Sequence, residues 1–342
     1  MNIDPDRLAD LRARKLAALV RGRWGEITGA PRSTAFPGGS TLIDEVGGRV
    51  WVLTDDDPAR RLGGALAVAV RAHADEVHVL VSDPLAGGIL ARRASQFRDA
   101  PHVWLVDDLD LLEIQPAAPA VELPVAPGAE LYRPVLAAAG LRPIAEGGIL
   151  LGEYRGLEVA RVVIDADGTA RVETGVGRFD RDAGALMFAD QGETDALARV
   201  VELAGQYRRA DAERHPINQL VAERWLRDIV LTQPHLVGAR SLEAVPAAVL
   251  RRNLLESGVA SATGESVDGT RLLVTCSTGV DLDLVPSAAD DRLSAAPGAR
   301  LVLVLPARDA VPLTHDIAAR LAAPAEVVVV PDNWRELTLE GS

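Results

Sequence analysis

The pattern of apolar and polar positions divides the chain into a leading helix and a longer region of alternating strands and helices. Residues 4–23 carry leucines at near-helical spacing among arginines, with Asp4 or Asp6 as N-cap, which is typical of an amphipathic helix. From residue 49 onward, short β-branched runs alternate with helical patterns. The pattern predicts strands at 50–53, 77–81 and 103–106 and helices at 58–72 and 88–97. This order favours a compact parallel sheet.

A different pattern, that of a β-meander leading into a helix, covers residues 147–188. Residues 157–164 and 170–176 are rich in β-branched side chains, and the polar loop between them contains Gly168, which can take a positive φ. These features predict an antiparallel hairpin. We therefore expect a short meander in the middle of the chain, between two regions of α/β order.

The length of this loop fixes the register that we expect for the hairpin. Side chains that pair across an antiparallel ladder share a face of the sheet, so a five-residue loop places Arg161 opposite Glu173. The two should form an ion pair on the polar face. The same alternation puts Glu158 on the apolar face, opposite to the face of Glu173, where a carboxylate is unusual.

Three candidate catalytic residues lie where the hairpin meets the next helix. Asp180 is positioned to cap that helix, and Glu158 should lie near it and within reach of Arg178. Burial and neighbouring charge shift the pKa of a carboxylate in such a place, and groups with a shifted pKa gather at functional sites. The alternative is a structural ion pair between Glu158 and Arg178 that ties the strand to the helix.

His215 is the fourth candidate catalytic residue. It stands at the start of a helix predicted for residues 215–226, where the helix dipole favours the neutral imidazole, a form that can accept a proton. The alternative is that His215 serves as a helix cap or a surface residue. The six histidines show no paired helical spacing, so the sequence contains no histidine metal motif.

The last third of the chain returns to α/β order and contains a candidate metal site. Strands are predicted at 272–276, 301–305 and 326–330, and helices from 287 and at 313–321. After the first of these strands, Asp281 and Asp283 alternate with apolar residues and so point to one face. They could hold a hard cation such as Mg²⁺, with Asp290 or Asp291 completing the site, or they could be solvated.

Length and proline content suggest two packed units. A chain of 342 residues exceeds the size at which one core usually stops growing. Residues 111–128 contain four prolines and no clear period, which predicts a Pro/Ala-rich linker. It would join residues 1–110, the N-terminal helix and its α/β unit, to residues 129–342, a meander–helix and C-terminal α/β domain. The predicted fold class is α/β, with two α/β units whose short parallel sheets flank a central β-meander and its helices.

Composition and charge exclude several kinds of function. The net charge of −13 disfavours an extensive nucleic-acid surface or binding to an anionic membrane. Lys15, in the leading helix, is the single lysine, so we expect neither a phosphate-binding Gly-Lys-Ser/Thr loop nor a Schiff-base lysine. Cys276 is the single cysteine, which excludes an internal disulfide and a thiolate metal cage. We interpret Cys276 as a small core residue.

The sequence indicates a cytoplasmic protein. Its first residues lack the basic and then apolar pattern of a signal peptide. No uninterrupted apolar run reaches the ~18 residues of a transmembrane helix, and the low cysteine content fits a reducing compartment. We expect no membrane association.

Two resemblances to known proteins rest on particular segments. Residues 175–183, Gly-Val-Gly-Arg-Phe-Asp-Arg-Asp-Ala, and residues 215–220, His-Pro-Ile-Asn-Gln-Leu, together resemble a group of uncharacterised proteins of high-GC actinobacteria. This resemblance implies no activity. The order of a helix, a three-stranded meander and a helix resembles the core of PD-(D/E)xK nucleases, whose acids would correspond to Glu130, Glu158 and Glu173. The lysine of that motif is missing, because Gly175 stands two positions after Glu173.

These patterns support two hypotheses on function. The first is a cytoplasmic α/β protein that acts by binding a protein or a small molecule, without conventional catalysis and without a cofactor. The alternative is a divergent, metal-dependent phosphodiesterase or nuclease-like enzyme that uses Mg²⁺. The enzyme hypothesis requires at least two carboxylates to converge on a point that could hold a divalent ion.

Overall fold

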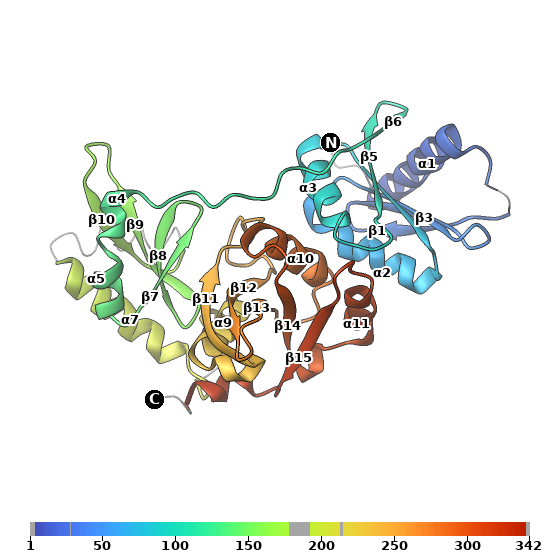
Figure 1. Cartoon of the computed structure of the whole chain (residues 1–342). Coiled ribbons are helices and arrows are strands. Elements are labelled where there is room, and N and C mark those ends of the chain that lie inside the picture. Colours follow the sequence, from blue (N-terminus) through green and yellow to red (C-terminus); the bar gives the residue numbers. More distant parts are fainter. Residues whose placement is uncertain (1–3, 28, 178–191, 213–214, 340–342) are drawn as a thin grey trace. The chain divides into compact units, whose positions relative to one another are not determined.

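The computed structural model describes residues 4–27, 29–177, 192–212 and 215–339 (Figure 1). Helices and strands alternate along most of this length, and the strands form three sheets. The predicted α/β fold class is thereby confirmed.

Contacts divide the chain into two units. Unit 1 comprises Met1–Pro119, Leu282–Asp290 and Val311–Ala325, and unit 2 comprises Ala120–Asp281, Asp291–Ala310 and Glu326–Ser342. The change of unit after Pro119 falls inside the segment 111–128 that the sequence predicts as a linker. Residues 282–290 and 311–325, which the sequence assigns to the C-terminal domain, belong to unit 1.

Unit 1 contains a six-stranded sheet whose strands follow one another in the order β1-β2-β3-β4-β5-β6. The strands are β1 (Arg32–Phe36), β2 (Gly39–Asp44), β3 (Arg49–Thr54), β4 (Glu76–Val81), β5 (His102–Asp107) and β6 (Asp110–Glu113). The first three form an antiparallel meander, β3, β4 and β5 are parallel, and β6 returns antiparallel. The parallel strands are buried on both faces and therefore read as nearly continuous apolar runs.

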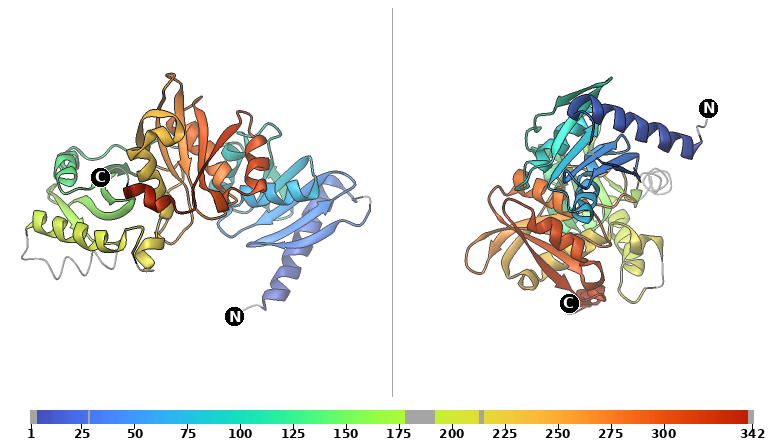
Figure 2. Two further views of the ribbon diagram at one scale, coloured as in Figure 1. Left: turned by 90° about the horizontal axis from the view of Figure 1, so that it is seen from below. Right: turned by 90° about the vertical axis from the view of Figure 1, so that its right-hand side faces the viewer.

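Helices α1 (Pro5–Trp24), α2 (Leu62–Ala72) and α3 (Pro84–Ala94) pack against this sheet. The 3₁₀ helix η1 (Pro58–Arg60) contacts α3 and α2, and α11 (Pro312–Ala319) contacts α2. Leu16, Leu19 and Val20 of α1 pack on the face that carries Trp51. The N-terminal end of α1 extends beyond the strands (Figure 2), and Leu11 is accordingly half exposed.

An aromatic cluster fills the space under α1. Trp51 and His78 are paired positions on neighbouring parallel strands, and their rings stack at 5.5 Å. His78 Nδ1 accepts a hydrogen bond from Trp104 Nε1 at 3.2 Å. Burial, with the charges of His102 and Arg49, lowers the pKa of His78 to about 3. His78 is therefore a neutral core residue at ordinary pH.

Unit 2 begins with a four-stranded antiparallel sheet in the order β10-β9-β8-β7. Its strands are β7 (Arg142–Glu146), β8 (Ile149–Tyr154), β9 (Leu157–Ile164) and β10 (Ala170–Thr174). The helices α4 (Pro127–Glu130), α5 (Arg133–Ala138) and α7 (Glu193–Tyr207) accompany it. Apolar side chains of these helices, such as Leu136 and Leu197, form one core with Leu150 and Val162 of the sheet.

The expected register of the hairpin is confirmed, but the expected face of Glu158 is wrong. Ala170 pairs with Ile164 and Glu173 with Arg161, as the loop length predicts. Between β8 and β9, however, Gly152 pairs with Ala160 while Glu153 pairs with Glu158.

Val159 is thus an extra residue on β9, a β-bulge, and it reverses the alternation of side chains on its two sides. Glu158 consequently shares a face with Arg161 and Glu173 instead of lying opposite to them.

The second sheet of unit 2 repeats the strand order of unit 1. Its strands follow the order β11-β12-β13-β14-β15, with β11–β12–β13 as an antiparallel meander and β14 parallel to β13. They are β11 (Ala239–Val245), β12 (Ala260–Ser266), β13 (Arg271–Cys276), β14 (Arg300–Pro306) and β15 (Ala325–Val330). The accompanying helices are α9 (Ala222–Thr232) and the 3₁₀ helices η2 (Pro234–Val237), η3 (Ala307–Asp309) and η4 (Trp334–Leu339). Helix α10 (Leu284–Ala295) is divided, because its residues up to Asp290 belong to unit 1 and the rest to unit 2.

Helix α9 contacts both sheets of unit 2 because its two faces differ. Trp225, Leu226, Ile229 and Val230, at helical spacing, enter the core of the five-stranded sheet. The opposite face carries arginines and acids that bond to the four-stranded sheet, as described below.

The single helix predicted for residues 215–226 is wrong. The segment contains α8 (Pro216–Gln219) and the start of α9, separated by Val221 in the left-handed conformation with φ 42° and ψ 47°. A β-branched residue rarely adopts this conformation, which costs about 1–3 kcal/mol. Buried contacts must therefore hold Val221 in place.

The hairpin turn between β8 and β9 packs against α9, and two glycines of the four-stranded sheet provide a test of this contact. Arg155 and Gly156 both have positive φ, as a two-residue turn of type I′ requires. A Cβ on Gly156 would lie 2.2 Å from the carbonyl carbon of Arg224, whereas one on Gly168, which also has a positive φ, would meet nothing within 4 Å.

We predict that Gly168→Ala lowers the free energy of unfolding by about 1–2 kcal/mol, the cost of the left-handed conformation alone. Gly156→Ala should lower it by about 2–5 kcal/mol, because the backbone of α9 must also move. Urea unfolding of the two variants measures the difference. Equal losses would mean that the turn does not contact α9 in solution.

Candidate functional site

A group of buried charges lies between α9 and the four-stranded sheet. Glu153 of β8 accepts a hydrogen bond from Arg224 at 3.0 Å and another from Arg227 at 2.7 Å. Arg224 also donates to Glu146 of β7 at 2.6 and 2.8 Å. The side chain of Glu153 is 1% exposed, and those of Arg224 and Arg227 are 7% and 3% exposed. Both carboxylate oxygens of Glu153 are therefore occupied by arginine.

These contacts decide the charge of Glu153. Burial by itself would raise the pKa of this carboxyl, but the charges and hydrogen bonds of Arg227 and Arg224 outweigh it, and the pKa lies below its ordinary value. Burial likewise disfavours the charged form of Arg224, yet Glu153 and Glu146 raise its pKa further. Glu153 and Arg224 are thus ionised at neutral pH, and Glu153 is a weak base.

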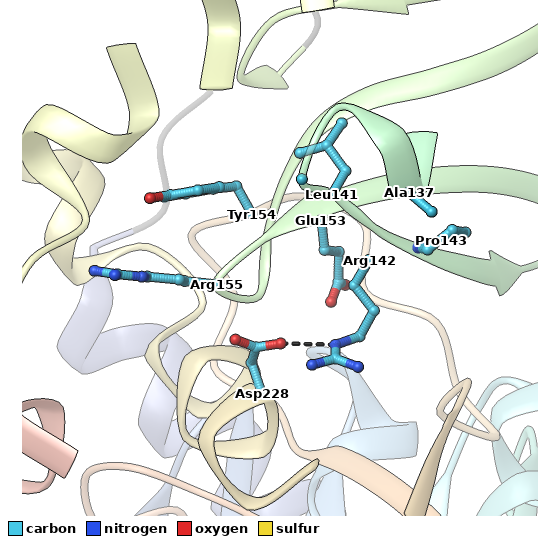
Figure 3. A pocket seen from close by; sticks show the side chains of 9 residues that line it. Ala137, Leu141, Arg142, Pro143, Glu153, Tyr154, Arg155 and Asp228 are labelled. Atoms are coloured by element: carbon cyan, nitrogen blue, oxygen red, sulfur yellow. Dashed lines mark hydrogen bonds and ion pairs between the residues drawn. The ribbon is translucent and has the colours of Figure 1, made fainter. Parts of the chain in front are cut away.

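A cavity of about 490 Å³ opens beside this group (Figure 3). Its lining residues are Ala137, Gly140, Leu141, Arg142, Pro143, Glu153, Tyr154, Arg155 and Asp228. Arg142 and Asp228 face each other across its polar side, and Arg142 Nε donates to Asp228 Oδ1 at 2.7 Å. Ala137, Leu141 and Pro143 form an apolar side. The cavity therefore joins a charged wall to an apolar one.

Arg208 binds the turn that lines the cavity and the segment before α9. Its side chain is fully buried and donates hydrogen bonds to the carbonyl groups of Ile217, Leu220 and Val221, and to that of Arg155 at the turn. Burial lowers the pKa of Arg208 to about 10, so the group still carries its charge at neutral pH. These bonds hold both the strained Val221 and the turn that lines the cavity.

Glu158 contacts Arg161, with 2.8 Å between Arg161 Nε and Glu158 Oε1. The predicted partner Arg178 and the predicted helix cap Asp180 lie outside the described residues, so the predicted contact between Glu158 and Arg178 stays a prediction. The expected ion pair of Arg161 with Glu173 is wrong, because Glu173 pairs with Arg171 at 2.9 Å. The bulge at Val159 explains the contact of Arg161 with Glu158, since it brings Glu158 to the face of Arg161.

His215 occupies the cap position that the sequence offered as its alternative role. Its Nδ1 accepts a hydrogen bond from the backbone N–H of Ile217 at 3.3 Å, at the start of α8. The ring stacks on Tyr207 with 4.1 Å between centroids. A ring nitrogen that caps a helix is not free to abstract a proton from a substrate.

The aspartates of the predicted metal site have separate partners where the structure records them. Asp283 Oδ1 accepts a hydrogen bond from Gly63 N at 2.7 Å. Asp290 is held by Arg92 and Arg93 at 2.7 to 3.1 Å, and Asp291 accepts from Ser261 and from Ala248 N, each at 2.7 Å. Within the described residues, no group of three or more His, Cys, Asp or Glu side chains is arranged to hold a metal ion.

The acids of the nuclease resemblance are also engaged separately. Glu130 is bound to Arg133, Glu158 to Arg161 and Glu173 to Arg171. The order of helix, meander and helix recurs from α1 to α2 and from α9 to α10. This order alone therefore does not single out residues 129–188 as a nuclease core.

Cys276 agrees with the interpretation of a core residue. It is fully buried in the core under α9, and burial raises the pKa of its thiol to about 12. Such a thiol is not a nucleophile at neutral pH.

Sequence reasoning missed the residues that form the cavity. The partners Arg142 and Asp228 are 86 positions apart, and Glu153 and Arg224 are 71 apart. One signal was present, since residues 223, 224, 227 and 228 are all charged and share one face of a helix whose other face is apolar. A helix with two such faces in the middle of a chain predicts a buried polar contact.

The chain matches no protein-family model, no curated protein and no solved structure. Among the residues that the structure describes, no helix is both long and apolar enough to cross a membrane.

The buried pairing of Glu153 gives a stability prediction. Glu153→Gln leaves Arg224 and Arg227 without a full counter-charge, and the free energy of unfolding should fall by about 3–5 kcal/mol. Glu173→Gln makes the same change of charge at a partly exposed ion pair, whose acid is 27% exposed against 1% for Glu153, and should cost under about 1 kcal/mol. Urea unfolding at pH 7 measures both.

The same comparison has a pH dependence with a defined sign. The pKa of Glu153 is lowered on folding, so its contribution is complete above the ordinary carboxyl pKa of about 4.3. It is lost as the pH falls toward the lower pKa of the folded state. The stability difference between wild type and Glu153→Gln should therefore shrink on acidification, and a difference independent of pH would contradict this assignment.

Proposed function

We propose that this protein binds a small molecule in the cavity beside α9 and performs no conventional catalysis there. The observation that carries the proposal is the cavity itself, whose volume of about 490 Å³ lies in the range of small-molecule sites. A rigid charged wall and an apolar wall meet in it, which is the composition that such sites need for affinity and orientation.

The chemistry of the lining argues against a catalytic role. The nine lining residues include no serine, cysteine, histidine or lysine. Glu153 has a lowered pKa and is therefore a poor general base, and Asp228 is engaged by Arg142 at 2.7 Å. The proposal therefore assigns the cavity to binding.

Filling the cavity provides the test. Ala137 and Ala138 are both exposed residues of α5, and only Ala137 lines the cavity. Compounds from a panel of small metabolites that raise the Tm of the wild type should raise that of Ala138→Trp equally and leave that of Ala137→Trp unchanged, because bound ligand stabilises only a protein with an open site.

Thermal unfolding with and without each compound measures this effect. Equal stabilisation of both tryptophan variants would place binding elsewhere and contradict the proposal. A panel in which no compound stabilises the wild type would contradict it too.

A further inference from the structure

We propose that the ligand of this cavity is a small organic anion, with a carboxylate or phosphate group bound by Arg142 and an apolar body of a few carbon atoms. This inference rests on the proposed function and specifies its ligand. It is carried by the hydrogen bonds of Arg142, by the balance of charge around the cavity and by the apolar wall.

The guanidinium group of Arg142 is oriented but not saturated. Its Nε donates to Asp228 and its Nη2 to Thr232 Oγ1 at 3.3 Å. A guanidinium carries five N–H groups, and no described residue accepts a hydrogen bond from Nη1 of Arg142. The edge formed by Nη1 and the second hydrogen of Nη2 is therefore left for a ligand, and the side chain is 37% exposed and within reach.

The geometry of this edge selects the chemical class. Two parallel N–H groups match the two oxygens of a carboxylate or of a phosphate, and such paired bonds are among the strongest polar contacts in proteins. Asp228 acts as a positioning residue, because its bond to Nε fixes the plane of the guanidinium group.

Arginines predominate around the cavity. Arg142 and Arg155 line it. Arg224 and Arg227 are bonded to its Glu153, and Arg208 exchanges hydrogen bonds with Arg155.

Fewer carboxylates belong to the same contacts. They are Glu146, Glu153 and Asp228, and Glu223, which also acts on Arg208 and Arg224, is paired with a further arginine, Arg251. Six arginines therefore face four acids, and two positive charges remain in excess. A local positive charge in a protein with a net charge of −13 is a specific feature, and it favours an anion in a partly buried site where charges are weakly screened.

The apolar lining residues determine the rest of the ligand. Ala137, Leu141 and Pro143 present carbon atoms to the cavity. A free inorganic anion would leave this wall in contact with water, whereas an anion with a short hydrocarbon body would cover it. We therefore expect an organic acid or a phosphate monoester.

Three probes of similar shape test the charge requirement: isobutyrate, isobutyl phosphate and neutral isobutyramide. Their binding to the full chain is measured by heteronuclear NMR titration at constant ionic strength, with sodium chloride as the reference salt. Each anion should bind with a Kd at least tenfold lower than that of isobutyramide. The better of the two anions identifies the headgroup.

Two variants with the same change of charge test whether Arg142 binds the anion. Arg142→Gln should weaken the binding of the anions at least tenfold and leave the weak binding of isobutyramide unchanged. Arg171→Gln removes an exposed arginine of the same sheet that does not line the cavity, and anion binding should stay within twofold of the wild type. Thermal unfolding confirms that both variants are folded.

The outcomes separate this inference from the proposed function. If acid and amide bind equally, and Ala137→Trp abolishes both, the cavity is a binding site but the anion assignment is wrong. If Arg142→Gln and Arg171→Gln lower anion affinity equally, the effect is one of overall charge and the assignment is also wrong. If none of the three probes binds, or if Ala137→Trp binds them as the wild type does, the proposed function fails together with it.

Discussion

The charged contact between α9 and the four-stranded sheet is the interaction on which unit 2 depends. Removing Glu153, Arg224 and Arg227 from water costs several kcal/mol per ion, and this cost is offset only when all three meet in good geometry. Successive residues of a helix are separated by about 100°. A shift of α9 by one residue would therefore leave Glu153 buried without a partner and would turn Trp225 away from the other core. The buried charges thus select one position of the helix, while the apolar contacts supply most of the stabilisation.

Arg208 has a related role on the other side of this helix. The segment before α9 cannot continue as one helix because Val221 is left-handed, and the carbonyl groups around the break point inward. A buried guanidinium has five N–H donors and can bond four carbonyl oxygens at once, whereas a neutral amide side chain has only two donors. The guanidinium carbon of Arg208 also lies 4.8 Å from the ring centroid of Trp225, and this contact adds a favourable cation–π interaction. A cation held by neutral carbonyl groups also keeps its charge, and so adds to the positive field at the cavity.

The sequence predicts features that depend on residues close together in the chain, such as strand register. It does not predict features that depend on contacts between distant residues. Strand alternation and loop length were sufficient to predict the backbone register that places Arg161 opposite Glu173. The α/β class followed from the periodicity of apolar residues along the chain. The bulge at Val159 did leave a local signal. Glu158 and Arg161 are three positions apart with Val159 and Ala160 between them, which breaks the two-residue period of a regular strand. A regular strand was assumed instead, and Glu158 was therefore assigned to the wrong face. The cavity has no comparable signal, because Asp228 approaches Arg142 only after α9 has packed.

The net charge of the protein is negative, whereas the charge around its cavity is positive. The two can coexist because solvent screens charges that lie far apart. At physiological ionic strength, charges more than about 8 Å apart across solvent are largely screened. An anion in bulk solvent is therefore repelled only weakly by the acidic residues, which are spread over the whole chain. In the proposed complex the anion contacts Arg142, in a partly buried site where solvent screens the interaction less than it does at the open surface. On this proposal the acidic residues of the surface oppose the non-specific adsorption of anions, and the arginines around the cavity attract an anion at one place. An acidic surface combined with a basic cavity would therefore favour selective binding over tight binding to every anion.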